Sequence, residues 1–195
     1  QPLPSGISIC ILAVSDDAIL EAARLVQTPG CLYLHTAGSV PMQVFEGITE
    51  HYGVLYPLQT MTKGQRTDLS AVPFLIEANS VENLEKIREL ALRLSPAVQE
   101  ASSEARLYYH LAAVLANNFS NHLYYQAEQL LKAQGLSFDL LLPLISETAR
   151  KVHEMPPEQA QTGPARRGNH KVMEMHLKLL ENKPGLAEMY RVMSG

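Results

Sequence analysis

Short apolar runs alternate with amphipathic segments over the first hundred residues. The runs at 7–14, 31–35, 51–55 and 72–77 have the composition of buried strands, and residues 96–99 are predicted to form a short last strand. Between them, residues 16–26 and 81–94 place apolar side chains at helical spacing. Strands that alternate with helices predict an α/β fold with a parallel or mixed sheet that is covered on both faces.

The pattern changes at Ser102, after which no strand is predicted. Residues 103–134 contain no Pro or Gly and predict one long helix, and further helices are predicted at 139–155, 169–181 and 184–193. We therefore expect two domains, an α/β domain over 1–101 and an all-α helical bundle over 102–195. Long helices of this kind often pair with a second subunit, which predicts a homodimer through the helical domain.

Composition and charge exclude several classes of partner. The chain has 195 residues, 46% of them apolar, and a net charge of -4, so we expect a real core and no general affinity for nucleic acid or for anionic membrane. The apolar stretches are too short to cross a bilayer. Cys10 and Cys31 lie in apolar runs and are expected to be reduced, as in a cytoplasmic protein.

The seven histidines are dispersed, and no pair of them has the spacing of a metal site, so no metal is expected. Neither cysteine belongs to a C-x-x-C motif, and no G-x-S-x-G occurs.

A polar stripe runs along the long predicted helix. Its members are spaced 7, 4 and 7 residues apart and share one helical face: His110, Asn117, Asn121 and Glu128. An unpaired buried amide costs about 1–3 kcal/mol, so these groups need partners. The stripe is interpreted either as a wall that faces a ligand or as a set of hydrogen bonds between helices or subunits; the pattern favours the second.

Two strand ends carry candidate chemistry. His35, Thr36, Gly38 and Ser39 follow the second strand, and Tyr56 and Gln59 follow the third. In open α/β sheets, ligands bind at the carboxyl ends of the strands. His35 is a candidate proton donor or acceptor, but a single histidine at a strand end is more often a packing residue.

The densest polar loop in the helical half is residues 161–168. Gln161 and Thr162 are candidate substrate contacts there, and Arg166 or Arg167 could hold a carboxylate or phosphate through two hydrogen bonds. The alternative is solvated charge between two helices, which the sequence alone favours.

Five segments of the chain, taken in order, resemble a known family: residues 11–19, 34–39, 52–60, 110–119 and 161–167. The family consists of uncharacterised proteins provisionally assigned as oxidoreductases, with a Rossmann-like NAD(P)-binding domain followed by a helical domain of unknown function. In plan it is similar to pyrroline-5-carboxylate reductase and to the 6-phosphogluconate and β-hydroxyacid dehydrogenases.

The resemblance implies positions for a cofactor, NADP or NAD. Ala13, Val14 and Ser15 match the strand end that lies beside the cofactor in related dehydrogenases, and residues 35–39 would border the nicotinamide and the substrate. Asn117 falls on the helix that carries the catalytic Lys or Asn of β-hydroxyacid dehydrogenases.

The sequence departs from the family at its beginning, because no G-x-G-x-x-G occurs anywhere in the chain. This turn supplies the N–H groups that hold a dinucleotide's pyrophosphate. We therefore expect the chain to be the larger, C-terminal part of a longer protein, with a partial Rossmann-like sheet.

Two functions are compatible with these observations. The first is an NAD(P)-dependent oxidoreductase that acts on a small substrate held between the two domains, with His35 or His110 as acid–base residue and Asn117 and Asn121 orienting the substrate. The second is a non-catalytic dimeric module for ligand binding or interaction, in which the polar stripe forms an interface.

Overall fold

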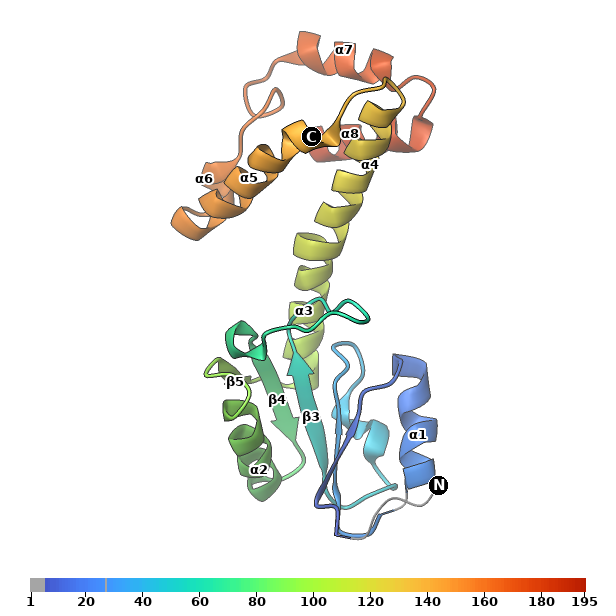
Figure 1. Ribbon diagram of the computed structural model, residues 1–195, viewed down its shortest axis with the longest axis vertical. Coiled ribbons are helices and arrows are strands. Elements are labelled where there is room, and N and C mark those ends of the chain that lie inside the picture. The colour runs from blue at the N-terminus through green and yellow to red at the C-terminus, as the bar shows by residue number, and fades with distance from the viewer. Residues whose placement is uncertain (1–5, 27) are drawn as a thin grey trace. The chain divides into compact units, whose positions relative to one another are not determined.

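The computed structural model describes residues 6–26 and 28–195, which form an α/β part followed by an all-helical part (Figure 1). The chain divides into two compact units, Gln1–Ser120 and Asn121–Gly195. This division lies nineteen residues beyond the predicted domain boundary after residue 101. The predicted boundary itself remains a prediction. The α/β fold class is confirmed.

The first unit is built on a five-stranded sheet with the order β1-β2-β3-β4-β5. The strands in chain order are β1 (Ile9–Leu12), β2 (Leu32–His35), β3 (Tyr52–Pro57), β4 (Phe74–Ala78) and β5 (Val98–Glu100). Strands β1 to β3 are parallel, β4 is antiparallel to β3, and β5 is parallel to β4. The sheet is therefore mixed, and all five predicted strands are present with shifted ends.

The first strand is shorter and less buried than predicted. In the described part of the chain β1 is the edge of the sheet, and it is four residues long instead of eight. Ile11 and Val14 are 45% and 44% exposed. An apolar run indicates a strand that can be buried on both sides, but burial also requires neighbours, and β1 pairs only with β2 among the described strands.

Two apolar layers cover the faces of the sheet, as the alternation of strands and helices predicts. On one face, Leu34, Leu55 and Ile76 pack against Ile87 and Ala91 of α2 (Val81–Leu92). The opposite face packs against α1 (Ile19–Val26) and the 3-10 turn Met42–Phe45, and further along against the start of α3 (Ser103–Ala113). Ser80 caps α2 by accepting from the Asn83 N–H.

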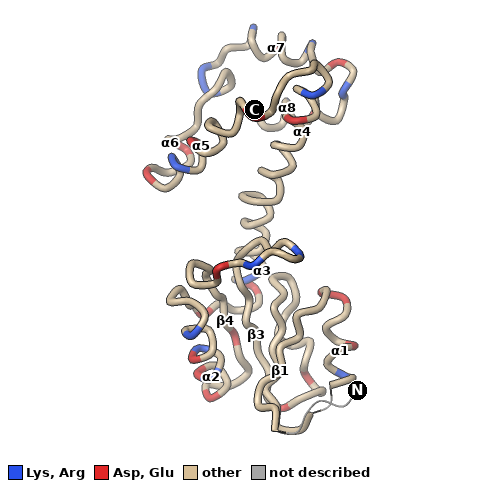
Figure 2. Tube along the Cα trace, viewed as in Figure 1, with Lys and Arg blue, Asp and Glu red and all other residues tan. Residues whose placement is uncertain are grey.

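The long predicted helix contains a change of helical type. Helix α3 passes into a π-helical segment, Val114–Phe119, and then into α4 (Ser120–Lys132). No Lys, Arg, Asp or Glu occurs from Leu107 to Ala127, which is the uninterrupted tan stretch of this helix in Figure 2. The periodicity predicted a helix here but could not distinguish a π turn from an α turn.

The second unit is all-helical, as predicted. Its other helices are α5 (Leu142–Glu154), α6 (Pro157–Ala160), α7 (His170–Leu179) and α8 (Pro184–Ser194). Tyr190 of α8 shares a 2.8 Å hydrogen bond with Nδ1 of His176 of α7. Among its described apolar residues, Leu180 and Ala187 are buried, whereas Leu140 and Leu179 are 82% and 77% exposed. No helix in the described part of the chain is long and apolar enough to cross a membrane.

Candidate functional site

A cavity of about 420 Å³ lies in the first unit at the carboxyl ends of β2 and β3. This volume is in the range of small-molecule sites. Three strand-end segments and one helix line it, with the residues Asp16, Thr36, Ala37, Gly38, Tyr56, Leu58, Gln59, Thr60, His110, Ala113, Val114, Asn117 and Asn118. The carboxyl ends of the strands, where a ligand was predicted to bind, thus carry a cavity.

Parallel pairing explains why these segments meet. Because β2 and β3 run in the same direction, the segments after His35 and after Pro57 emerge at one edge. The helix contributes one face, with His110, Ala113, Val114, Asn117 and Asn118 spaced as i, i+3, i+4, i+7 and i+8. The last three of these lie in the π-helical segment, an element that is frequent at functional sites.

Tyr56 and His110 form a pair of interacting polar side chains in the cavity. The Tyr56 hydroxyl lies 3.3 Å from Nδ1 of His110, and the two rings meet edge to face at a centroid distance of 6.2 Å. Gly38 makes this possible, because a Cβ at position 38 would lie 2.6 Å from Nδ1 of His110 and 2.9 Å from Cζ of Tyr56. Burial raises the pKa of Tyr56, so its hydroxyl keeps its proton.

Asp16 is the acidic residue of the cavity. It follows β1 in a 3-10 turn, and its carboxylate accepts a hydrogen bond from the hydroxyl of Ser39. This bond ties the segment after β1 to the segment after β2. Ser39 was predicted as a cofactor contact; in the described structure it holds a lining residue and does not itself line the cavity.

His35 does not line the cavity and is completely buried. Its Nδ1 accepts a 3.2 Å hydrogen bond from the Ala37 N–H, which places the imidazole proton on Nε2. Burial, together with the Arg106 guanidinium, lowers the pKa of His35 to about 4. This geometry supports the packing alternative, in which His35 shapes the loop that carries Thr36 and Gly38. Its predicted acid–base role remains a prediction.

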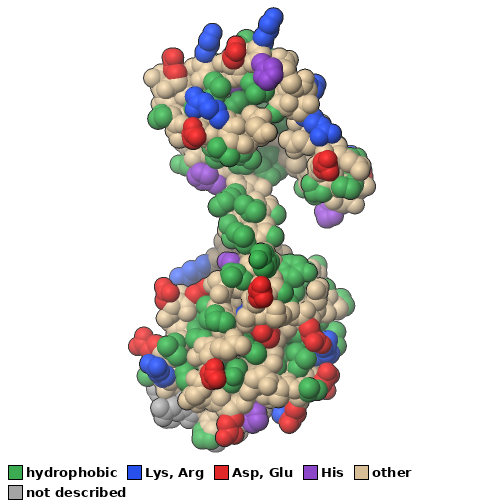
Figure 3. Space-filling view, turned by 180° about the vertical axis from the view of Figure 1, so that it is seen from behind, with side chains coloured by type: hydrophobic (Ala, Val, Ile, Leu, Met, Phe, Trp, Pro, Cys, Tyr) green, Lys and Arg blue, Asp and Glu red, His purple; other side chains and the backbone are tan. Residues whose placement is uncertain are grey.

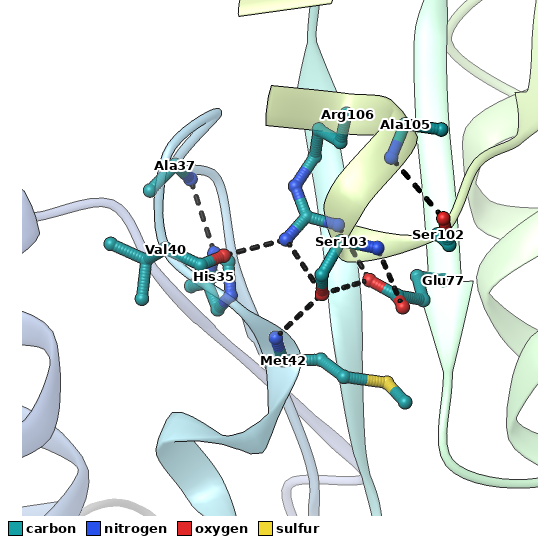
Figure 4. A network of polar contacts seen from close by, with 9 residues as sticks. All are labelled: His35, Ala37, Val40, Met42, Glu77, Ser102, Ser103, Ala105 and Arg106. Carbon is teal, nitrogen blue, oxygen red and sulfur yellow. Dashed lines mark hydrogen bonds and ion pairs between the residues drawn. The ribbon is translucent and has the colours of Figure 1, made fainter. Parts of the chain in front are cut away.

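A buried ionic cluster joins α3 to the sheet (Figure 4). Nη1 of Arg106 donates to Glu77 across 2.6 Å, and the Ser103 hydroxyl donates to the same carboxylate across 2.7 Å. Nη2 of Arg106 donates to the Val40 carbonyl, and the Met42 N–H donates to the Ser103 hydroxyl. The cluster therefore fixes the loop between β2 and the following 3-10 turn against the start of α3.

The sequence analysis did not identify this cluster, although two signals for it existed. Arg106 is four residues before His110 and shares its helical face, and Glu77 is a single charge in an otherwise apolar strand. A charge in a buried strand needs a partner, and Arg106 is 1% exposed. Asp16 and Asn118 were also missed as lining residues.

The other predicted site residues do not line this cavity. Ala13, Val14 and Ser15 are exposed after β1. Asn121, Gln161, Thr162 and Arg166 are exposed residues of the second unit, so their substrate-binding roles remain predictions. The side chains of Asn117, Asn121 and Glu128 form no hydrogen bond with any other described residue, so of the predicted stripe only His110 has a partner within the described part of the chain.

A larger hollow of about 1000 Å³ lies at the opposite end of the strands, lined by residues that precede β2 and β3, such as Gly30 and Glu50. Ligands of open α/β sheets bind at the carboxyl ends, so we take the smaller cavity as the candidate site. The described residues contain no group of three or more His, Cys, Asp or Glu that could hold a metal ion.

The cavity's donor and acceptor groups fit one half of a nicotinamide dinucleotide. Hydroxyl and amide side chains dominate, with Thr36, Gln59, Thr60 and Asn117, and they suit a carboxamide and a ribose. Among the described residues no Lys or Arg lines the cavity, and no glycine-rich turn is present for the pyrophosphate. The residues therefore fit the nicotinamide end, and this chain's described part offers nothing for the phosphates.

Comparisons with solved structures identify relatives. A protein from Bacteroides fragilis, described as a provisional NADP oxidoreductase, is 44% identical with a TM-score of 0.91, over 96% of this chain and 73% of that one. A protein from Thermotoga maritima is 21% identical with a TM-score of 0.80, over 98% of this chain and 81% of the other. An imine reductase from Myxococcus stipitatus in complex with NADP+ is 16% identical with a TM-score of 0.57, over 94% and 72%, and shows likeness of fold alone.

A comparison with curated proteins finds no match. Residues 72–195 match the family described as a domain of unknown function, DUF2520. This stretch includes α3, the π-helical segment and the whole second unit, and the resemblance to a family with a Rossmann-like domain and a helical domain is confirmed. The chain belongs to the DUF2520 family.

Proposed function

We propose that this protein is an NAD(P)-dependent oxidoreductase that acts on a small carbonyl, imine or hydroxy compound. The observation that carries the proposal is the cavity at the carboxyl edge of the sheet, which combines neutral hydrogen-bonding side chains with the Tyr56–His110 pair. The 44% identity to a provisional NADP oxidoreductase supports the same conclusion.

Five of the lining residues have a part in this function. A bound nicotinamide supplies or accepts hydride. Thr36 and Gly38 border the nicotinamide, while Gln59 orients the substrate. His110 and Asn117 hydrogen-bond the substrate heteroatom, whose charge changes as hydride moves, and such bonds stabilise the transition state where they are preorganised. The cluster around Arg106 keeps the loop that carries Thr36 and Gly38 in place.

Calorimetric titration of the full-length protein with NADPH and with NADH tests the proposal. We expect heat of binding with one of them, and a weaker signal for Asn117→Leu, which alters the cavity. Glu181→Gln in the second unit is the matched control and should bind like the wild type, because Glu181 is exposed and makes no ion pair with a described residue. No heat with either nucleotide at millimolar concentration would reject the proposal.

A second candidate function is a non-catalytic homodimeric module. Exposed apolar side chains support it, both in the second unit, at Leu140 and Leu144, and on the long helix, at Leu111, Leu115 and Phe119. Green side chains gather on this helix in Figure 3. Monomeric proteins seldom expose large contiguous apolar surface. Sedimentation of Leu144→Glu tests dimerisation: a monomer supports a helical interface, and an unchanged dimer excludes Leu144 from it.

A further inference from the structure

The contact between the Tyr56 hydroxyl and Nδ1 of His110 can run in either direction, according to the His110 tautomer, and the burial of Tyr56 favours donation by the hydroxyl. Tyr56 is 9% exposed, and among the described residues Nδ1 of His110 is the partner of its hydroxyl. A buried hydroxyl that donates to no group loses a hydrogen bond at a cost of about 1–3 kcal/mol. The Tyr56 proton is therefore best satisfied on Nδ1.

The direction of this bond decides where His110 carries its own proton. A neutral imidazole has one N–H and one bare nitrogen. If Nδ1 accepts from Tyr56, the N–H is on Nε2. Nε2 has no hydrogen-bond partner among the described residues, and it is not one of the buried unpartnered nitrogens, which are His35 Nε2 and Arg106 Nε. His110 lines the cavity, so this donor is free to bind a ligand there.

We infer that Tyr56 is a positioning residue that fixes His110 in the Nε2–H tautomer and so gives the cavity a defined hydrogen-bond donor. The inference rests on the proposed function for its chemical meaning, but the tautomer itself is a property of the folded chain. Gly38 is part of the arrangement, because any larger residue would place a carbon against both rings.

A fixed donor narrows the class of substrate. A carbonyl oxygen or an unprotonated imine nitrogen accepts a hydrogen bond from Nε2–H while it takes up negative charge from the arriving hydride. A protonated iminium would instead face His110 donor to donor. The site thus prefers substrates that present an acceptor heteroatom at the carbon that is reduced.

Nuclear magnetic resonance of the full chain labelled with 15N tests the inference without any substrate. Spectra that correlate the ring nitrogens with the ring C–H protons distinguish the two tautomers, and His110→Gln identifies the His110 signals among the seven histidines. In the wild type at pH 8 we expect a single Nε2–H tautomer, with the Nδ1 resonance shifted as in a hydrogen-bonded acceptor. An Nδ1–H tautomer would overturn the inference.

Tyr56→Phe removes only the hydroxyl and leaves the ring in contact with His110. We expect its Nδ1 resonance to move toward that of a free imidazole and the Nδ1–H tautomer to appear. Tyr52→Phe on the same strand is the matched control, because the Tyr52 ring packs on Phe45 and its hydroxyl bonds no described residue. An unchanged His110 spectrum in Tyr56→Phe would overturn the inference, as would an equal change in the control.

Titration of the same variants with NADPH separates this inference from the proposed function. We expect Tyr56→Phe to bind NADPH within twofold of the wild type, because the hydroxyl acts through His110 and not on the cofactor. With NADPH and a panel of cyclic imines and ketones, we expect about a tenfold lower kcat in Tyr56→Phe and little change in KM. Absence of NADPH binding in every protein would reject the oxidoreductase while leaving the tautomer result to decide the inference.

Discussion

His35 and Glu77 lie in one row across the sheet, each paired in register with Val54 of β3. They belong to different strands, β2 and β4, and both point to the face that α3 covers. The Arg106 side chain donates to Glu77 and contributes to the lowered pKa of His35. The buried Arg106 guanidinium therefore interacts with His35, with Glu77 and with the loop that follows β2.

Arg106→Met tests how much this cluster contributes to the stability of the protein. The substitution leaves the Glu77 carboxylate, 13% exposed, without its cation in a buried site. Removing one partner of a buried ion pair costs about 3–5 kcal/mol, so we expect a loss of that size in the free energy of unfolding. Urea denaturation followed by circular dichroism measures it.

The matched control for Arg106 is Lys86→Met. Lys86 pairs with Glu82 across 2.7 Å on α2, but both side chains are at least half exposed. Surface pairs contribute little, so the urea midpoint should stay where it is. In the double variant Arg106→Met with Glu77→Leu, part of the lost stability should return, because no charge is then left unpaired. Equal losses for the single and the double variant would argue against an ionic role for Arg106.

His35 predicts a dependence of stability on pH. Its pKa is about 4 in the folded chain and about 6.5 when unfolded. Between these values the unfolded chain binds the extra proton, so stability rises with pH across this window and is fully present above pH 6.5. This lowering of the His35 pKa corresponds to about 3 kcal/mol in the free energy of unfolding. Urea denaturation from pH 4 to pH 8 should show this slope for the wild type.

His35→Asn isolates that contribution. Its Oδ1 can replace Nδ1 as acceptor for the Ala37 N–H, and it cannot titrate. The difference between wild type and His35→Asn should therefore change by about 3 kcal/mol between pH 4 and pH 6.5. His122→Asn, at an exposed position, should follow the wild-type curve. A His35 ring whose proton resonances titrate near pH 6.5 in the folded protein would refute this prediction.

The strands, most helix ends and the edge of the sheet that carries the cavity could be predicted from the sequence, because apolar period and caps are local signals. The pairing of Arg106 with Glu77 could not, because it depends on which strand α3 crosses. The position of His35 shows the same limit. Its position at the end of a strand could be predicted from the sequence. Its complete burial could not, because it results from Phe45 and Arg106, which lie 10 and 71 residues further along the chain.

The surroundings of three glycines predict the order in which their substitution by alanine lowers the stability of the protein. A Cβ at Gly53 would overlap the Glu77 carbonyl oxygen and lie 2.6 Å from Cδ1 of Ile87, and backbone cannot move away. At Gly38 the obstacle is the side chains of His110 and Tyr56, which can shift, so we expect a loss of about 1–3 kcal/mol. Gly185 has open space around it.

Thermal denaturation of the three alanine variants measures this order. Gly53→Ala should have the lowest midpoint, Gly38→Ala an intermediate one, and Gly185→Ala one equal to or above the wild type, since alanine favours a helix. Gly38→Ala should also shift the His110 ring signals, which Gly185→Ala should leave in place. A Gly38→Ala protein with unaltered His110 signals would show that the two rings are not packed on this glycine.

Asn117 and Asn83 have the same side chain, but substitution by leucine should change the stability of the protein at Asn83 and hardly at all at Asn117. Asn83 is 1% exposed, and its Nδ2 lies 2.8 Å from Oδ1 of Asn79 and 3.3 Å from Nδ1 of His51, so Asn83→Leu should cost about 1–3 kcal/mol of stability. Asn117 is exposed in the cavity and bonds no described residue, so Asn117→Leu should change stability by less than about 0.5 kcal/mol.

If Asn117 binds a ligand, the affinity of the Asn117→Leu variant for NADPH or substrate should fall about tenfold, the equivalent of one hydrogen bond. If instead Asn117 belongs to a subunit interface, sedimentation of Asn117→Leu and Asn121→Leu should show dissociated dimers with unchanged nucleotide binding, and that result would favour the non-catalytic module over the enzyme.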